Sequence, residues 1–97
     1  FHCFSIDTQS TPDICGHGVG LDFHEGPLVF HVKQRGRGPK LEPGMIFTIE
    51  PMINAGSSDW FVDADDDWTV WTEDGSLSAQ WEYTVLVTED GYEILAR

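Results

Sequence analysis

Three side chains far apart in the sequence are of the types that bind a divalent metal ion together. His17 stands between two glycines, Glu50 ends an apolar segment immediately before a proline, and Glu82 interrupts the most apolar part of the chain. An imidazole and two carboxylates suit borderline ions such as Mn, Fe, Co or Zn. Because such ions lower the pKa of a bound water and polarise a carbonyl, this set favours metal-assisted amide hydrolysis, provided that the fold brings the three together.

Each of these residues also has an ordinary structural role open to it. The segment CGHGVGLDFHEGP, residues 15–27, predicts a glycine-rich loop in which the missing side chains let the backbone turn sharply near His17 and His24. Such a loop could simply hold two hydrogen-bonded histidines. Glu50 could be a partly solvated strand end and Glu82 could lie on a solvated face, so the residue types alone leave both interpretations open.

The elements that must position these residues are predicted to be β-strands. No stretch of eleven or more residues has helical apolar spacing without an interrupting Gly or Pro. Residues 45–50 predict a strand, and Asp-Gly turns at 74–75 and 90–91 divide the following apolar part into a three-stranded β-meander with Glu82 in mid-strand. Residues 54–67 predict a surface loop or an irregular hairpin.

Length, composition and charge narrow the class of protein. The 97 residues are 40% hydrophobic with a net charge of −12, which fits one small globular domain or a piece of a larger one. Residues 59–97 hold eleven acidic side chains against Arg97 alone, so their surface repels nucleic-acid phosphates and anionic lipid. We find no apolar run long enough to span a membrane and no secretory signal pattern, and we expect a cytoplasmic protein with Cys3 and Cys15 as free thiols.

Three motifs in order resemble one protein family. The segments CGHGVGLDFHEGP, LEPGMIFTIEPMINAG and DDWTVWTEDGSLSAQWEYTVLVTEDGYEIL are similar to the C-terminal half of type I methionine aminopeptidases, over residues 14–95. The resemblance implies an α/β (α+β) pita-bread fold, the creatinase/aminopeptidase fold, for the parent protein. Residues 1–97 would be its β-rich C-terminal half, with residues 1–13 poorly matched. The implied activity is that of a metallo-exopeptidase that removes N-terminal methionine from proteins and peptides.

The resemblance also implies roles for individual residues. The family's site holds two divalent ions (Co, Mn, Fe or Zn), and the ligands from its second half match His17, Glu50 and Glu82. By the same matching, Glu82 bridges the two ions, Glu50 is also the general base for the attacking water, and His24 donates a hydrogen bond to the scissile peptide. Phe23 and Trp68 match positions that line the pocket for the methionine side chain, although both could instead be ordinary core aromatics.

Two departures from the family pattern change what is expected of this chain. Tyr83 stands where the family usually has a histidine, so a hydrogen bond beside the ligands, and with it the ion preference, would differ. The family's two metal-binding aspartates and a further histidine belong to an N-terminal half that this sequence does not contain, and the acidic run of residues 63–67 does not match them. We therefore expect a partial catalytic domain that binds one ion weakly or none and has absent or marginal activity alone.

Alternatives remain for function and partners. The chain could be a non-catalytic folded fragment or binding module, or it could belong with the proline-specific peptidases of the same superfamily (Xaa-Pro aminopeptidase or prolidase), which share HGVGL and VLVTEDG features. The expected substrate is a peptide or nascent protein that begins with Met, and neither nucleic acid nor membrane is an expected partner. Because the fold has a pseudo-two-fold axis, a second copy of this chain could pair with it where the missing half would lie.

Overall fold

β-Strands form all of the regular structure in the part of the chain that the computed structural model describes, residues 9–10, 14–33 and 35–97. Within these residues there is no α-helix, and accordingly none long and apolar enough to cross a membrane. The mostly β prediction is therefore confirmed for the described residues. The strands are β1 (Gln9–Ser10), β2 (Gly16–Gly18), β3 (Glu25–Val29), β4 (Ile46–Ile49), β5 (Met52–Asn54), β6 (Trp60–Val62), β7 (Val70–Thr72), β8 (Ser78–Gln80), β9 (Tyr83–Val87) and β10 (Tyr92–Ala96).

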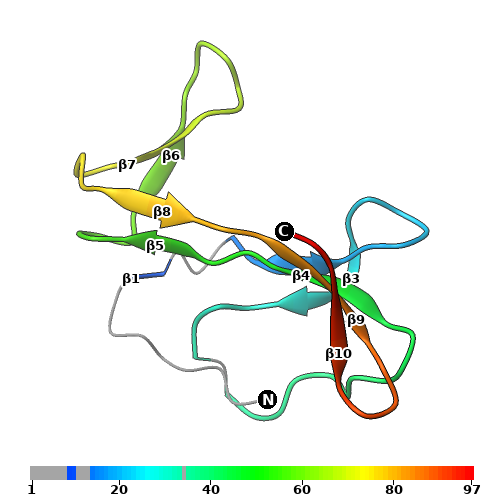
Figure 1. The fold of residues 1–97 in the computed structure, drawn as a ribbon. Coiled ribbons are helices and arrows are strands. Elements are labelled where there is room, and N and C mark those ends of the chain that lie inside the picture. Colours follow the sequence, from blue (N-terminus) through cyan, green and yellow to red (C-terminus); the bar gives the residue numbers. More distant parts are fainter. Residues whose placement is uncertain (1–8, 11–13, 34) are drawn as a thin grey trace.

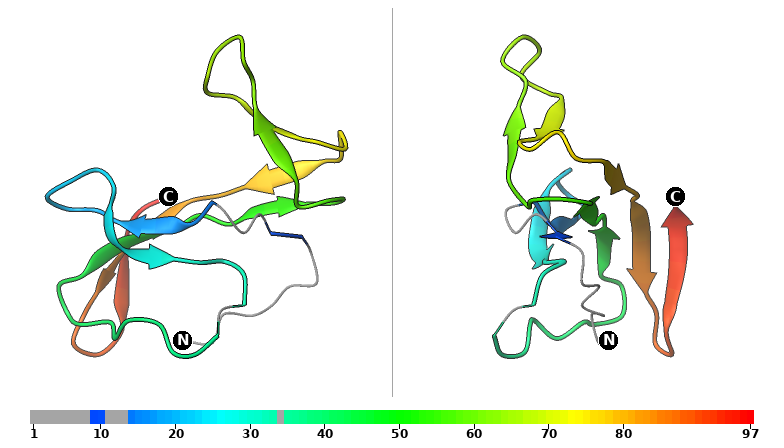
Figure 2. Two further views of the ribbon diagram at one scale, coloured as in Figure 1. Left: turned by 180° about the vertical axis from the view of Figure 1, so that it is seen from behind. Right: turned by 90° about the vertical axis from the view of Figure 1, so that its left-hand side faces the viewer.

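The strands pair into three antiparallel sheets (Figure 1). The largest has the order β10-β9-β4-β2-β3, the second has the order β1-β5-β8, and the third is the β6–β7 hairpin. Figure 1 and the side view in Figure 2 show the β6–β7 and β9–β10 hairpins projecting at opposite ends of the molecule. The middle of the five-stranded sheet, where β2, β4 and β9 are neighbours, therefore lies between the two projections.

Two adjacent chain segments connect the five-stranded sheet with the three-stranded one. Figure 1 shows β4 leading into β5 and, beside it, β8 leading into β9. The pairings Ile49–Tyr83 and Met52–Gln80, on the two sides of the break, belong to one uninterrupted antiparallel register. Pro51 lies in the break and has no N–H to donate to a ladder, which explains why the two sheets separate at this point.

Few side chains are buried by this arrangement. Among the described residues, Phe47 and Val85 are the buried hydrophobic side chains, and Thr48 and Asn54 are the buried polar ones. The chain exposes 7698 Å², about 2,000 Å² more than the roughly 5,600 Å² of a compact monomer of this size. The chain alone therefore encloses much less of a core than its length would permit.

The predicted glycine-rich loop is wrong at His17, because residues 16–18 form strand β2. This strand lies between β3 and β4. A Cβ atom on Gly16 would overlap the main-chain carbonyl of Thr48 in β4, and one on Gly18 would overlap the carbonyl of Gly26 in β3. The two glycines thus allow close approach of backbones on both sides rather than a sharp turn, and the loop is confined to the residues between β2 and β3.

Gly18→Ala is expected to lower the free energy of unfolding by about 1–3 kcal/mol, the usual range for an overpacked site. The added Cβ would lie 2.6 Å from the carbonyl carbon of Gly26, and backbone on both strands cannot rotate away as a side chain could. Urea denaturation followed by tryptophan fluorescence measures the change. Gly38→Ala is the matched control because a Cβ there meets nothing. Equal midpoints for the two variants would contradict the close-approach argument.

The predicted meander is correct for its second hairpin and wrong for its first. β9 and β10 pair across the 90–91 turn, but β7 and β8, on either side of the 74–75 turn, pair with β6 and β5. Glu82 accordingly lies in the break between β8 and β9 rather than in mid-strand. The irregular hairpin expected in residues 54–67 is present, since β6 begins within it and pairs with β7 across the acidic residues.

The carboxylate of Asp74 explains why the 74–75 turn does not close a hairpin. It accepts hydrogen bonds from the main-chain N–H groups of Ser57 (2.7 Å) and Ser76 (2.9 Å), so the turn is held against the loop between β5 and β6. The bond from Ser57, followed by those from Ser76, lowers the pKa of Asp74 to about 2.

This lowered pKa predicts that part of the stability of the chain disappears in acid. Below about pH 4 the unfolded chain takes up a proton at Asp74 that the folded chain excludes until about pH 2, so protons favour unfolding in this interval. Thermal midpoints between pH 5 and pH 2 are expected to fall more steeply for the parent than for Asp74→Asn. The control is Asp90→Asn, because the Asp90 carboxylate, at the other Asp-Gly turn, accepts a long hydrogen bond of 3.4 Å from the Thr88 hydroxyl. Parallel curves for parent and Asp74→Asn would refute the assignment.

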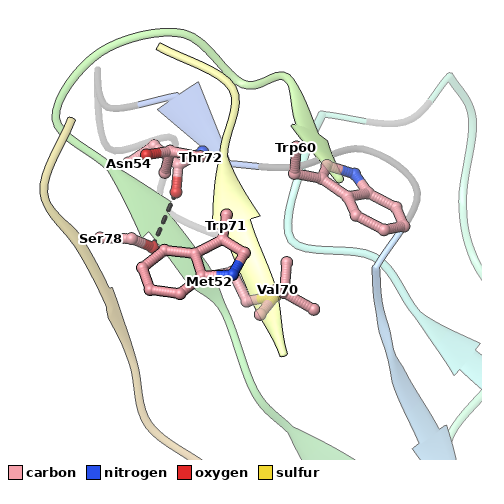
Figure 3. A pocket seen from close by; sticks show the side chains of 7 residues that line it. All are labelled: Met52, Asn54, Trp60, Val70, Trp71, Thr72 and Ser78. Atoms are coloured by element: carbon pink, nitrogen blue, oxygen red, sulfur yellow. Dashed lines mark hydrogen bonds between the residues drawn. The ribbon is translucent and has the colours of Figure 1, made fainter. Parts of the chain in front are cut away.

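The β6–β7 hairpin packs over β5 and β8 and leaves a small open depression there. Figure 3 shows the side chains of Trp60, Val70 and Trp71 from the hairpin and those of Asn54 and Ser78 from β5 and β8, with the Ser78 hydroxyl donating to Asn54 Oδ1 at 2.8 Å. The residues that line it are Met52, Asn54, Trp60, Val70, Trp71, Thr72 and Ser78. None of them belongs to the predicted catalytic, metal or substrate-binding sets, so the depression is a packing feature of the hairpin.

Candidate metal site

The structure brings His17, Glu50 and Glu82 together. One ligand-type atom of each lies within 4.8 Å of the others, and His17 Nε2 is 3.3 Å from Glu50 Oε1. The three residues come from β2, from the residue after β4 and from the residue before β9. Neighbouring strands therefore bring together the imidazole and the two carboxylates, as a metal site requires.

The register of β4 and β9 places the two glutamates face to face. Ile49 pairs with Tyr83, so the next residue along this pairing puts Glu50 opposite Glu82. Like charges directly opposite one another on paired strands repel. The sheet thus holds two carboxylates in an arrangement that a bound cation would stabilise.

A short chain of hydrogen bonds sets the position of His17 relative to Glu50. The His17 main-chain N–H donates to Thr48 Oγ1 (2.9 Å), and the Thr48 hydroxyl donates to Glu50 Oε1 (2.7 Å). Side chains two residues apart share a face of a strand, which places Thr48 and Glu50 on the same side of β4. Since Thr48 is only 2% exposed, the hydroxyl that holds the carboxylate is fixed in the interior.

The imidazole of His17 presents a lone pair to the glutamate. Nδ1 lies 2.9 Å from the carbonyl oxygen of Gly18, and because a carbonyl only accepts, Nδ1 carries the proton. In a neutral ring Nε2 then has no proton and faces Glu50 Oε1, another acceptor. The two side chains are only 12% and 17% exposed. A cation between Nε2 and Oε1 would make this contact favourable, and an acceptor of this kind for Nδ1–H is usual for metal-binding histidines.

The size of the group suits an ion of the Mn, Fe, Co or Zn class. Ligand atoms lie roughly 2.0–2.3 Å from such ions, so two ligands of one ion are at most about 4.5 Å apart. The 3.3 Å between His17 and Glu50 lies inside this limit, and the 4.8 Å bound on the whole group lies just outside it. Glu82 is exposed and can rotate by the small amount required. Among the described residues the group has no fourth member, so the acidic run of residues 63–67 does not join it.

His24 and Phe23 stand beside the metal group on the loop between β2 and β3. The His24 ring lies edge-on to the His17 ring with centroids 4.2 Å apart, and Phe23 lies 4.6 Å from His24 and 6.1 Å from His17. Phe23 is 77% exposed. The loop thus presents an imidazole and an aromatic ring to solvent next to the three ligand-type side chains.

Trp68 is not brought to the group by any contact found in the described part of the chain. It lies in the acidic loop between β6 and β7, is 85% exposed, and donates its main-chain N–H to Asp66 (2.9 Å). The alternative that Phe23 and Trp68 are ordinary core aromatics is wrong for this chain, since both are exposed. Tyr83, beside Glu82 at the start of β9, is partly exposed, and its effect on ion preference stays a prediction.

Two residues that contact the group were missed by the sequence reasoning. Thr48 could have been found, because it is a polar residue inside an apolar strand, two positions before Glu50. His31 gave no signal beyond its type. Its Nε2 accepts a hydrogen bond from the main-chain N–H of Glu50 (3.0 Å). Burial lowers the pKa of His31, and the nearby Glu50 carboxylate opposes this by raising it.

Comparison with known proteins agrees with this geometry. The model of metallopeptidase family M24 matches residues 4–89. The chain is 56% identical over 80 residues to the methionine aminopeptidase of Chlamydia pneumoniae, which covers 82% of this chain and 27% of that protein. It is 54% identical over 83 residues to methionine aminopeptidase A of Synechocystis, covering 86% of this chain and 32% of the relative. The chain spans about a third of the length of the relatives it matches.

Solved structures give the same result. The crystal structure of the Rickettsia prowazekii methionine aminopeptidase matches with a TM-score of 0.82 and 48% identity, over 91% of this chain and 36% of that one. The Thermotoga maritima methionine aminopeptidase also matches at a TM-score of 0.82, with 43% identity. The predicted resemblance to methionine aminopeptidases and the predicted fold class, a β-rich part of the pita-bread fold, are therefore confirmed. The chain belongs to metallopeptidase family M24.

Proposed function

We propose that this chain carries part of the catalytic centre of a methionine aminopeptidase, which removes N-terminal methionine from peptides and nascent proteins. The observation that supports it most directly is the meeting of His17, Glu50 and Glu82, whose ligand-type atoms lie within 4.8 Å of one another. Relatives that are more than half identical over the matched residues bear the name of this activity. Residues 1–97 would then be one unit, the C-terminal half of the catalytic domain.

In this proposal His17, Glu50 and Glu82 are metal ligands, and Glu50 and His24 are the catalytic residues. Divalent ions of the Co, Mn, Fe or Zn class, two in the complete site, would lower the pKa of water and polarise the scissile carbonyl. Glu50 takes the proton of the attacking water, and its carboxylate is oriented for this by the Thr48 hydroxyl. His24 donates a hydrogen bond to the peptide from the open side of the group, where its ring stands next to His17.

Phe23 and Trp68 are proposed to contact the methionine side chain of the substrate. Phe23 is supported by its place beside His24 and by its exposure, since an exposed ring next to a catalytic imidazole can bind an apolar side chain. Trp68 is supported only by the family match, because its side chain on the β6–β7 loop is largely exposed to solvent. Binding of substrate, or of a further segment of protein, would have to bring that loop toward the group.

The exposed surface supports a partner that completes the fold. An excess of about 2,000 Å² over a compact monomer is more than twice the roughly 800 Å² that each partner buries in an interface of standard size. We propose that a segment carrying the remaining metal ligands covers this surface, and that a second copy of the chain is the competing occupant. If nothing covers this surface, the same exposure favours the alternative of a non-catalytic folded module.

Cys15 is a free thiol, which supports a reducing compartment such as the cytoplasm, whereas Cys3 lies outside the described residues.

A chimaera tests the proposal. Residues 14–95 would replace the matching segment of the Rickettsia prowazekii methionine aminopeptidase, and release of Met from a Met-Gly-Met peptide would be followed with added Mn²⁺ or Co²⁺. We expect the chimaera to be active, the isolated chain to have absent or marginal activity, and Glu50→Gln to abolish activity in the chimaera. A folded chimaera that binds metal but releases no Met would reject the proposed function.

A further inference from the structure

His31 makes a contact with Glu50 that the proposed mechanism does not use. The residue lies two positions beyond the end of β3, and its imidazole is partly buried. Its Nε2 accepts a hydrogen bond of 3.0 Å from the main-chain N–H of Glu50. β2 lies between β3 and β4 in the sheet. The His31 side chain therefore extends past β2 to contact the end of β4.

The sheet itself offers no strand partner for this N–H group. β2 pairs with β4 through Gly18 and Phe47, and in this register its first residue, Gly16, lies opposite Ile49. Glu50 is therefore beyond the end of β2, and the proline that follows it ends the ladder. A main-chain donor left without a partner in the interior is costly. The imidazole of His31 fills the place that a strand carbonyl would have taken.

The hydrogen bond also fixes which nitrogen of His31 carries the proton. Nε2 accepts, so it is unprotonated, and the proton of the neutral ring is on Nδ1. Nδ1 is buried and has no hydrogen-bond partner in the part of the chain that the structure describes. Keeping a donor in that state is unfavourable, so the ring would be expected to turn unless the bond to Glu50 outweighs the loss.

We propose that His31 is a positioning residue that holds the backbone of Glu50 so that its carboxylate faces His17 and Glu82. The inference rests on the proposed function for the role of Glu50 as a ligand and base. Two separate contacts then fix this glutamate: the Thr48 hydroxyl holds its carboxylate, and the His31 ring holds its main chain. Loss of the second contact lets the strand end move although the first remains.

Two metal-free measurements on the full chain test the contact directly. In ¹⁵N spectra the His31 ring is expected to show the proton on Nδ1, which is the less common tautomer of a free imidazole. Hydrogen exchange at the Glu50 amide is expected to be slow in the parent, slow in His31→Gln, whose amide oxygen can replace Nε2 as acceptor, and fast in His31→Phe. A proton on Nε2, or equal exchange in parent and His31→Phe, would overturn the proposal without any variant having to bind metal.

Mn²⁺ titration by calorimetry tests the consequence for the site. We expect His31→Phe to weaken Mn²⁺ binding by about 10- to 100-fold, as loss of a contact that orients a ligand does, and His31→Gln to recover most of it. Unchanged affinity in a folded His31→Phe would contradict the positioning role. If the isolated parent binds no Mn²⁺, the same variants are titrated in the chimaera, where failure of the unsubstituted chimaera to bind would count against the proposed function. The tautomer and the Glu50 exchange rate would then still decide whether His31 holds Glu50.

Discussion

Glu50→Gln is expected to lower the affinity of the chain for Mn²⁺ by more than about 100-fold, which exceeds the usual effect of residues that only support a ligand. The substitution keeps the shape of the side chain but removes the charge that faces the lone pair of His17 Nε2 at 3.3 Å. It also leaves Thr48 and His31 in place, because an amide oxygen can accept from the Thr48 hydroxyl and the main-chain N–H is unchanged. The expected loss is therefore one of metal binding and not of fold.

Calorimetric titration of the parent, His17→Ala, Glu50→Gln and Glu93→Gln with Mn²⁺ measures this effect. Glu93→Gln is the matched control, since Glu93 is an exposed glutamate on β10 opposite Leu86 and outside the group. It removes the same charge from the same strongly acidic chain. If Glu93→Gln weakened binding as much as Glu50→Gln, the ion would be bound by the general negative field of the protein and not by the group.

Much of the fold could be predicted because its signals are local. Apolar alternation and Asp-Gly turns correctly indicated strands at 46–49, 83–87 and 92–96 and the hairpin across residues 90–91. The 74–75 turn could not predict that β7 pairs with β6 and that β8 pairs with β5. The turn is held against another loop by a hydrogen bond to Asp74 from the main-chain N–H of Ser57, seventeen positions away. Turn residues indicate where the chain reverses, and they do not indicate which strand the reversed chain meets.

In the candidate site, too, the residue types could be predicted from the sequence, whereas their arrangement could not. The residue types of His17, Glu50 and Glu82 predicted a ligand set, but its assembly depends on registers between strands that are remote in sequence. The glycines around His17 predicted a turn and instead permit close packing of strands, since the same missing Cβ serves both purposes. The role of His31 could not be predicted from the sequence, because it depends on β2 being too short to pair with the Glu50 N–H.

Glu82→Gln is expected to change metal affinity and metal-free stability in opposite directions. In the absence of metal, the substitution removes the repulsion between two carboxylates that lie opposite each other on the β4–β9 pairing. Cross-strand pairs of this kind contribute about 0.2–1 kcal/mol, so the thermal midpoint of the metal-free chain should rise by roughly 1–6 °C. With Mn²⁺ present, the variant lacks one of three ligands and its affinity should fall by more than about 100-fold.

A higher metal-free thermal midpoint together with a lower Mn²⁺ affinity distinguishes a metal site from an accidental cluster of carboxylates. With a net charge of −12, removing any carboxylate reduces the overall repulsion, so the change in midpoint must be compared with that of Glu93→Gln. The informative result is a larger rise for Glu82→Gln than for the control without metal, reversed at an Mn²⁺ concentration that saturates the parent. The parent and Glu93→Gln keep all three ligands and gain stability from the ion, whereas Glu82→Gln gains less. This result would show that the fold bears an unfavourable contact for which the ion compensates. Equal midpoints for the two variants, with or without Mn²⁺, would mean that Glu82 turns away from Glu50 into solvent and is no ligand.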